Sequence, residues 1–371
     1  MAASRSTTTL RNERFAWSPW VASTTCSRAP MPVANVPQRH RSRSLLARSA
    51  RAHRRSPHQP HRRTLALEHH LTTCSVNVIC QHGLLPTLTY NTSTLQQQWA
   101  WHATDPGNEG SLWGSGNGPA LDSSGNIYVE TANGFFDGVT NFSDSVVKLS
   151  PTGALLDYFT PYDQAVMQSN DIDLGSSGPV ILPDSVGSTA HPHVMIATGK
   201  VGVVYLLDQT NLGKYNSGAN QDLGEVAVGF NTTNITGGFF GQPAYWNGNI
   251  YTVMVGDSLR QFPVSNAAIA STSSSNSNNI FTFRGGTPSV SASGSTNGII
   301  WVADVTAYQS GGAVILDAYD ATNVTNPLYS SPASSTGAAA PAAKFTVPTV
   351  ANGKVYVGGQ YAFTVFGLLP N

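Results

Sequence analysis

Short apolar stretches alternate with polar turns along the C-terminal three-quarters of the chain, and one phrase recurs among them. The phrase is a proline, then a short turn, then a stretch of β-branched and aromatic residues. Such residues favour strands, because their side chains pack well on a pleated surface. No stretch beyond residue 95 holds apolar residues at helical spacing over three turns. The pattern therefore predicts an all-β protein.

Five prolines mark the copies of this phrase, namely Pro119, Pro179, Pro243, Pro288 and Pro348, which are 60, 64, 45 and 60 residues apart. A unit of this size cannot bury its own apolar face and has to stack on a neighbour. The spacing suits one blade of a β-propeller, and we predict about four to five recognisable four-stranded blades in a ring that is complete or incomplete. A two-sheet β-sandwich also has short strands and turns, but it does not predict a repeated phrase.

Individual turns can also be predicted from the repeats. The Asn-Gly pairs at 247–248, 297–298 and 352–353 each precede a strand-like run. Asn-Gly supplies the positive φ angles that a tight hairpin needs, so we expect a hairpin turn at each pair. The polar run 271–279 reads as a loop between strands.

The zero net charge of the chain is the average of two unlike parts. Residues 1–95 contain 13 Arg, no Lys and two acidic residues, which gives +11, whereas the remainder carries −11. A change of composition this sharp indicates a boundary. We predict a disordered Arg-rich segment over residues 1–88 and a propeller over residues 89–371, because the first part has too little apolar surface to offset the entropy of the chain.

The origin of the Arg-rich segment has several explanations. Four explanations stay open: a genuine disordered tail, the product of an alternative reading frame in GC-rich DNA, a targeting segment, and an arm that contacts nucleic acid. No nucleic-acid recognition module follows it, so we predict no nucleic-acid partner. Cys74, Cys80 and His82 suggest zinc, but their spacing fits no standard finger or ribbon. No apolar run reaches the length of a membrane span, and no secretory signal is visible.

Four elements between residues 127 and 213 follow one another in the order of a known family. They are the strand end Glu130–Gly134, the strand and turn Asp144–Gly153, the acidic loop Asn170–Leu174 before Gly178–Leu182, and the Lys-x-Gly strand Lys200–Asn211. This order and spacing resemble the central part of the propeller in dehydrogenases that depend on pyrroloquinoline quinone (PQQ). The resemblance covers about a quarter of the chain well.

The resemblance implies PQQ and calcium as cofactors and a role for each matching residue. Asn133 would place an amide oxygen on the calcium ion. Asp173, or Asp171, would be the general base that takes a proton from the substrate hydroxyl. Lys200 would contact the quinone oxygen and stabilise the reduced anion. The family's vicinal cysteine pair has no counterpart here, and most of its blade-docking tryptophans are missing.

These departures favour a PQQ-repeat-like propeller that is a non-catalytic binding module, with a small molecule or a protein as its unknown partner. The alternative is a PQQ- and calcium-dependent quinoprotein dehydrogenase that oxidises an alcohol or a sugar. In either case the resemblance implies a place outside the cytoplasm, periplasmic or secreted. Propeller folds have many functions, so the fold alone does not choose between the two.

Overall fold

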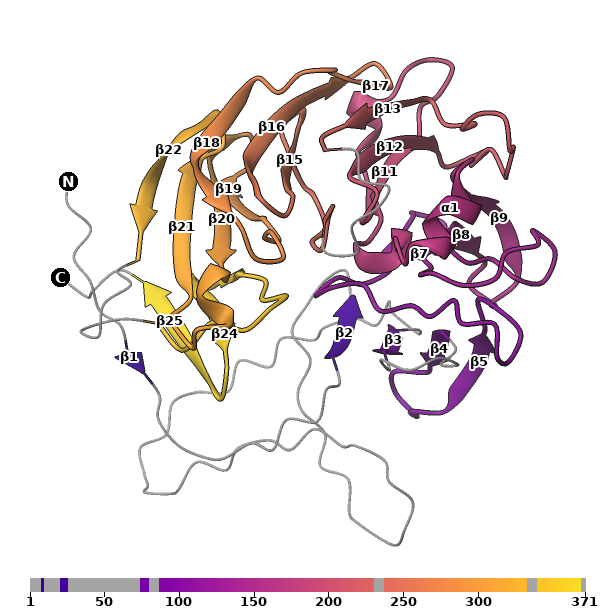
Figure 1. Ribbon diagram of the computed structural model, residues 1–371, viewed down its shortest axis with the longest axis horizontal. Helices are drawn as coiled ribbons and strands as arrows, with labels where there is room; N and C mark the ends of the chain where they lie inside the picture. The colour runs from indigo at the N-terminus through magenta and orange to yellow at the C-terminus, as the bar shows by residue number, and fades with distance from the viewer. Residues whose placement is uncertain are drawn as a thin grey trace, which may run out of the picture.

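The computed structural model describes residues 8–9, 21–25, 74–79, 87–229, 237–331 and 339–367. Their strands form six antiparallel sheets arranged around a common centre (Figure 1). Five sheets have four strands and one has five. The β-propeller that the repeats predicted is confirmed.

Each sheet is a blade, and its strands are neighbours in the chain except in the last blade. The first three blades consist of β2 (Val21–Thr25), β3 (Cys74–Ile79), β4 (Thr87–Tyr90) and β5 (Gln97–Trp101); β6 (Ala120–Leu121), β7 (Ile127–Glu130), β8 (Val146–Leu149) and β9 (Leu155–Phe159); and β10 (Val180–Ile181), β11 (Val194–Thr198), β12 (Val203–Asp208) and β13 (Gly224–Ala227). The other three consist of β14 (Ala244–Trp246), β15 (Asn249–Val253), β16 (Asp257–Ser265), β17 (Ala268–Ile269) and β18 (Ser275–Phe281); β19 (Ser289–Ser293), β20 (Thr296–Asp304), β21 (Ile315–Asp320) and β22 (Asn323–Ser330); and β23 (Thr349–Ala351), β24 (Lys354–Gly359), β25 (Ala362–Gly367) and β1 (Thr8–Thr9).

Helices are few and short in the described part of the chain. They are α1 (Gln164–Ser169) and the 3₁₀ turns η1 (Leu174–Ser176), η2 (Asp184–Val186) and η3 (Thr306–Tyr308). None of them has the length and apolar composition that crossing a bilayer requires.

The repeated prolines mark the start of the blades. Pro119, Pro179, Pro243, Pro288 and Pro348 stand immediately before β6, β10, β14, β19 and β23, the first strand of five sheets. Proline cannot donate a ladder hydrogen bond, so it suits a position just outside the strand. The phrase therefore located five blades, and the sheet of β2 to β5 is a sixth that it did not predict.

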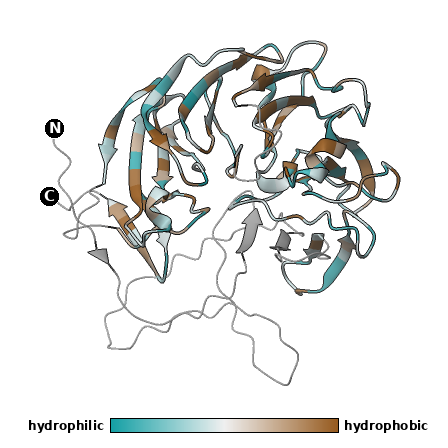
Figure 2. Cartoon of the chain, viewed as in Figure 1, coloured by the Kyte–Doolittle hydropathy of each residue, from teal (hydrophilic) through white to brown (hydrophobic). Residues whose placement is uncertain are grey.

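The hydrophobic core consists of layers between neighbouring blades. In β12, Val203, Tyr205 and Leu207 pack into the layer shared with the β6–β9 blade, whereas Val204 and Leu206 pack into the layer shared with the β14–β18 blade. Successive side chains of a strand point to opposite faces, so a strand between two other blades is apolar on both faces. Figure 2 shows this as hydrophobic colour along the strands of the ring.

Two of the three predicted Asn-Gly turns are confirmed. Asn247 and Gly248 have φ angles of 47° and 77°, and Asn352 and Gly353 have 50° and 70°. The third prediction was wrong in position. Asn297 lies inside β20 beside a shift of register, and the turn before it contains Gly294 at φ 61°.

The polar run 271–279 is also corrected by the structure. Its second half belongs to β18, which pairs with β16 from Asp257↔Phe281 to Gln261↔Ser275. Ser277 is buried there, and its hydroxyl accepts a hydrogen bond from the Leu259 N–H at 3.0 Å. Pairing with an existing strand thus overrides the low strand propensity of Ser and Asn.

Three short strands lie within residues 1–88, for which we predicted disorder. β1 pairs with β25 through Thr8↔Val365, β2 pairs with β3, and β3 pairs with β4 through Cys74↔Tyr90. The rest of the segment up to residue 86 lies outside the described residues. The boundary between residues 88 and 89 therefore stays a prediction.

Candidate functional site

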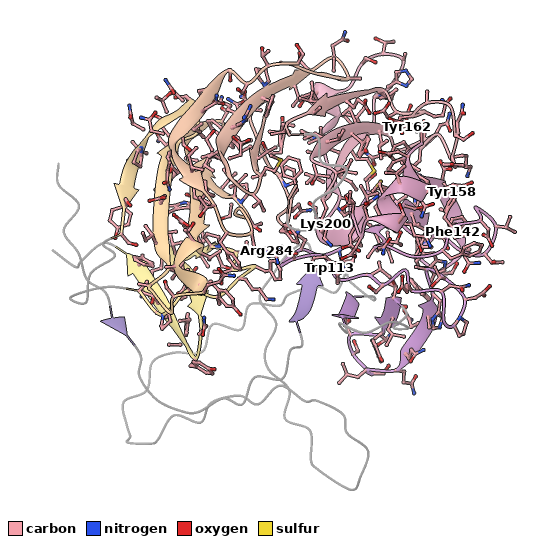
Figure 3. All side chains as sticks on the ribbon, in the orientation of Figure 1. Trp113, Phe142, Tyr158, Tyr162, Lys200 and Arg284 are labelled. Atoms are coloured by element: carbon pink, nitrogen blue, oxygen red, sulfur yellow. The ribbon has the colours of Figure 1, made fainter. Side chains whose placement is uncertain are left out.

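The residues that the resemblance selected lie in loops on one face of the ring. In an antiparallel blade, the loops after the second and the fourth strand leave the sheet at the same end. Asn133 and Lys200 follow the second strands of their blades, β7 and β11, whereas Asp171 and Asp173 follow a fourth strand, β9. Figure 3 shows Lys200 directed toward the middle of the ring.

The structure brings these four residues together. The Asn133 backbone N–H donates a hydrogen bond to Asp173 Oδ1 at 2.9 Å. Lys200 Nζ forms an ion pair with Asp173 Oδ2, donates to the Asp171 carbonyl at 3.0 Å and lies 3.7 Å from Asp171 Oδ2. We call Asn133, Asp171, Asp173 and Lys200 the central site.

Burial distinguishes the two aspartates. The side chains of Asp173 and Lys200 are 8% and 7% exposed, whereas that of Asp171 is 57% exposed. Opposite charges interact strongly where water is excluded. The ion pair of Asp173 and Lys200 is therefore the electrostatic centre of the site, and Asp171 contributes mainly its backbone carbonyl.

Two glycines allow the loops of the central site to approach one another. A Cβ on Gly199 would lie 2.6 Å from Leu174 Cα and 2.8 Å from the Asp173 carbonyl oxygen, and a Cβ on Gly175 would lie 2.7 Å from the Thr131 carbonyl carbon. These distances are too short for any side chain. Because residue 199 has no Cβ, the Lys200 N–H can donate to the Asp173 carbonyl at 2.9 Å, which sets the lysine beside the aspartate.

A third aspartate, Asp144, stands behind the site and was not predicted as a site residue. It is fully buried, accepts from the Leu174 N–H at 3.1 Å and contacts Gln164 Nε2 at 3.4 Å. Burial raises the pKa of Asp144 well above its ordinary value, and the negative charge of Asp173 adds to the effect, whereas the Leu174 N–H and the Lys200 charge oppose it. Asp144 thus braces the Asp173 loop through its hydrogen bond from the Leu174 N–H.

Aromatic rings and a second cation lie beside Lys200. Its Nζ is 5.8 Å from the Trp113 ring centroid and 5.9 Å from that of Phe240. Phe345 stacks on Phe240 at 6.0 Å and 17°, and the Arg284 guanidinium lies 4.8 Å from the Phe240 centroid. We call Trp113, Phe240, Arg284 and Phe345 the aromatic–cation cluster. Trp113 and Arg284 reach the middle of the ring together with Lys200 (Figure 3).

Sequence reasoning missed this cluster, although the repeats contain a signal for it. Each member lies a few residues before a blade proline, in the loop that joins the last strand of one blade to the first strand of the next. Asp173 occupies the equivalent loop before Pro179. Because equivalent loops of a propeller meet around one axis, large or charged residues in this position identify the lining of that face.

The residues present fit the two implied cofactors unequally. Asn133 Oδ1 is buried and has no hydrogen-bond partner among the described residues, as an amide oxygen kept for a cation would be. Calcium requires about six to eight oxygen ligands, however, and the described ranges contain no group of three or more acidic, His or Cys residues that could hold a metal ion. The central site and the aromatic–cation cluster together offer aromatic faces and two cations to a planar anion. The quinone therefore fits these residues better than the calcium ion does.

Comparison with known proteins supports the fold. No protein-family model matches the chain, and neither does any curated protein. Among solved structures, the chain is similar to the quinohemoprotein alcohol dehydrogenase ADHIIG of Pseudomonas putida HK5, with 12% identity and a TM-score of 0.53, and to the quinohemoprotein alcohol dehydrogenase of Comamonas testosteroni, with 13% and 0.52. Each alignment covers 81% of this chain and 59% of the other. The propeller type that the motifs indicated is thereby confirmed as a fold.

Proposed function

We propose that this propeller is a non-catalytic module that binds a planar, anionic, aromatic small molecule where the central site meets the aromatic–cation cluster. The observation that carries the proposal is the position of Arg284. Its guanidinium lies over the face of Phe240, and it forms no hydrogen bond or ion pair with any residue in the described ranges. A half-buried cation without a counter-charge is suited to an anionic ligand.

The surroundings of Arg284 define the ligand class. Trp113 and Phe240 offer ring faces on which a planar molecule can stack, and a carboxylate on that molecule can take both N–H groups of the guanidinium. Lys200 adds positive charge, although Asp173 and Asp171 already compensate part of it. PQQ, a planar quinone with several carboxylates, belongs to this class, which is where the resemblance and the geometry agree.

Asp173 favours binding over catalysis. Its Oδ1 accepts the Asn133 N–H, and its Oδ2 is paired with Lys200. A general base has to offer an oxygen to the substrate hydroxyl, and here both oxygens have partners within the protein. The described residues also contain no group of three or more acidic, His or Cys side chains that could hold a calcium ion.

The second candidate is a PQQ- and calcium-dependent dehydrogenase that oxidises an alcohol or a sugar. The orphaned Asn133 Oδ1 beside Asp173 favours it. In that reaction Asn133 would bind the metal, Asp173 (with Asp171 as the exposed substitute) would take the hydroxyl proton, and Lys200 would face the quinone oxygen. For both candidates we propose a place outside the cytoplasm, on the resemblance alone, and a protein partner remains the alternative to a small molecule.

Calorimetry with PQQ, with and without calcium, tests the proposal. We expect the wild type to bind PQQ and Arg284→Ala to bind at least about tenfold more weakly, which corresponds to about 1.4 kcal/mol. Lys200→Ala should also weaken binding. Lys354→Ala removes an exposed lysine of β24 in another blade and serves as the control that should bind like the wild type.

Two outcomes would contradict the proposal. Absence of PQQ binding to the folded wild type would exclude this ligand class. Calcium-dependent oxidation of an alcohol or sugar with an artificial electron acceptor, lost in Asp173→Asn, would instead establish the dehydrogenase. Circular dichroism of each variant checks that its blades are intact before binding is compared.

A further inference from the structure

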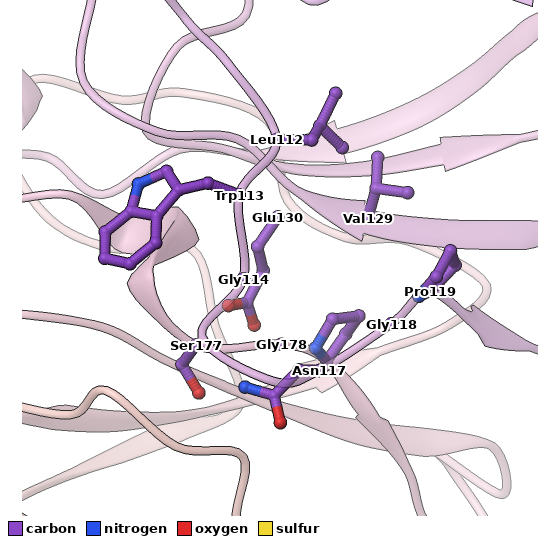
Figure 4. Close-up of a pocket in the computed structure, with 11 residues that line it drawn as sticks. Leu112, Trp113, Gly114, Asn117, Gly118, Pro119, Val129, Glu130, Ser177 and Gly178 are labelled. Atoms are coloured by element: carbon purple, nitrogen blue, oxygen red, sulfur yellow. The ribbon is translucent and has the colours of Figure 1, made fainter. Parts of the chain in front are cut away.

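A small cavity lies next to Trp113, between the blade of β6–β9 and the blade of β10–β13. Figure 4 shows the side chains that line it, and its volume is about 30 Å³. It is lined by the loop Leu112–Pro119, by Val129 and Glu130 at the end of β7, and by Ser177, Gly178 and Pro179 before β10. Trp113 belongs both to this wall and to the aromatic–cation cluster.

Glu130 is the unusual residue of the cavity. It is 4% exposed, and neither of its carboxylate oxygens has a hydrogen-bond partner among the described residues. Alternation along β7 places its side chain on the same face as Tyr128, which packs in the layer shared with the next blade. An acidic residue thus occupies a position where the rest of the strand is apolar or aromatic.

A second orphaned polar group shares the cavity. Asn117 is 4% exposed, and its Nδ2 has no partner, although its Oδ1 accepts the Gln242 N–H at 3.2 Å. A buried polar group without a hydrogen bond costs about 1–3 kcal/mol. A cavity needs about 10–15 Å³ for each water molecule, so this one has room for about two.

We propose that this cavity is a water site in which Glu130 carries a proton. The neutral carboxyl O–H donates to a water molecule, and that water also accepts a hydrogen bond from Asn117 Nδ2. A metal or other simple cation suits the cavity less well, because the Asn117 NH₂ group would face it. Water satisfies all the orphaned atoms without any further charge.

The charges around Glu130 agree with a protonated acid. No other titratable side chain lines the cavity in the described part of the chain. Lys200 lies 5.8 Å from the ring of Trp113, but it is already paired with Asp173. Burial raises the pKa of Glu130 well above its ordinary value, and the nearby Thr198 N–H lowers it only in part.

The proposed site does not depend on what binds at the centre of the ring. The proposed site does predict that the centre of the ring responds to pH. Glu130 is the last residue of β7, the strand that leads to Asn133, and Trp113 lines its cavity. Ionisation of Glu130 would place an unpaired charge behind Trp113, and the loop from Leu112 to Pro119 would have to open to hydrate it.

Carbon-13 labelling of glutamate side chains tests the proposal in the full-length protein. The chain has five glutamates, Glu13, Glu68, Glu109, Glu130 and Glu225. At neutral pH we expect one carboxyl signal at the position of a protonated acid and the others at that of carboxylates. The protonated signal should be absent in Glu130→Gln and present in the control Glu225→Gln, which changes a strand-edge residue.

Exchange into D₂O identifies the water. A carboxyl proton in contact with cavity water should exchange rapidly while the protein stays folded, and its infrared carbonyl band should shift with it. Five ionised signals at neutral pH in the wild type would overturn the proposal, and this reading requires no variant to fold. A protonated signal that survives in folded Glu130→Gln, or that exchanges only on unfolding, would also overturn it.

Discussion

Asn133 and Asp173, which are 40 positions apart in sequence, are joined by a hydrogen bond of 2.9 Å from the Asn133 N–H to Asp173 Oδ1. The bond connects the loop after β7 to the loop after β9 and therefore fixes the carboxylate from one side while Lys200 holds it from the other. Asp173 is positioned by backbone and charge together. Contacts within the protein alone therefore hold the two loops together.

The effects of mutating Asp173 and Lys200, the buried ion pair, on unfolding free energy should depend strongly on each other. Asp173→Asn leaves the Lys200 ammonium buried without its carboxylate, so we expect a loss of about 3–5 kcal/mol in unfolding free energy. Lys200→Met should cost a similar amount for the converse reason. The double variant should lose less than the sum of the two, because it leaves no unpaired charge. Urea unfolding of the three variants measures this, and strict additivity would show that the two side chains do not interact.

Gly199 should tolerate no side chain. In Gly199→Ala the new methyl group would overlap Leu174 Cα and the Asp173 carbonyl, so we expect about 1–3 kcal/mol of destabilisation from overpacking. Gly224→Ala is the matched control, because a Cβ there meets nothing within 4 Å. Equal unfolding midpoints for the two variants would contradict the close approach of the loops.

The sequence predicts the ring better than it predicts the lining of the centre. Short continuous apolar runs, separated by turns and prolines, determine the blades because a strand between two blades is buried on both faces, as Val203 to Leu207 show. Arg284, Trp113 and Phe345 belong to different repeats and share only their place a few residues before a blade proline. Their proximity depends on how the ring closes, which is a property of the packed blades rather than of any single stretch.

Predictions from local sequence propensity were wrong where strand pairing or burial overrides that propensity. The Ser- and Asn-rich β18 is a strand because β16 offers it an unpaired edge. Glu130 was passed over because a strand-end acid is ordinarily exposed, and only the packed blades show that it is enclosed. In contrast, the convergence of Asn133, Asp173 and Lys200 follows from placing a motif of matched spacing on a propeller.

Asp144 should contribute a loss of stability as pH rises above about 4. Burial raises the pKa of Asp144 in the folded state, so the folded protein keeps a proton that the unfolded chain releases above about pH 4. Each pH unit in that window costs up to about 1.4 kcal/mol per such group. Asp144→Asn keeps an acceptor for the Leu174 N–H but has no proton to lose. It should therefore be more stable than the wild type at pH 7 and gain little at pH 4.

Chemical denaturation at several pH values measures the effect of Asp144→Asn. The control is Asp105→Asn, which changes an exposed carboxyl and should leave the dependence on pH as it is in the wild type. An Asp144→Asn variant with the same dependence on pH as the wild type between pH 4 and pH 7 would contradict a protonated Asp144.

A hydroxyl connects two blades at Tyr251. This side chain is fully buried in β15, and its Oη donates to the Ala321 carbonyl of the next blade at 2.5 Å. Tyr251→Phe leaves that carbonyl without its partner, so we expect a loss of about 1–3 kcal/mol. Tyr356→Phe, at a half-buried tyrosine of β24, should change stability by less than about 0.5 kcal/mol. Similar thermal midpoints for both variants would show that the connection contributes nothing.

Limited proteolysis addresses the boundary that the switch in charge predicts. If residues 1–88 are a disordered segment, trypsin should cut at many of its arginines and leave a resistant core that begins near Tyr90. If β2 and β3 are held in a sheet by their pairing with each other and with β4, they should instead be protected from cleavage. Mass spectrometry of the resistant fragments distinguishes the two results. Fragments that retain residues 21–25 or 74–79 after extended digestion would move the start of the propeller upstream, whereas a core from about residue 89 that still melts cooperatively would confirm the predicted boundary.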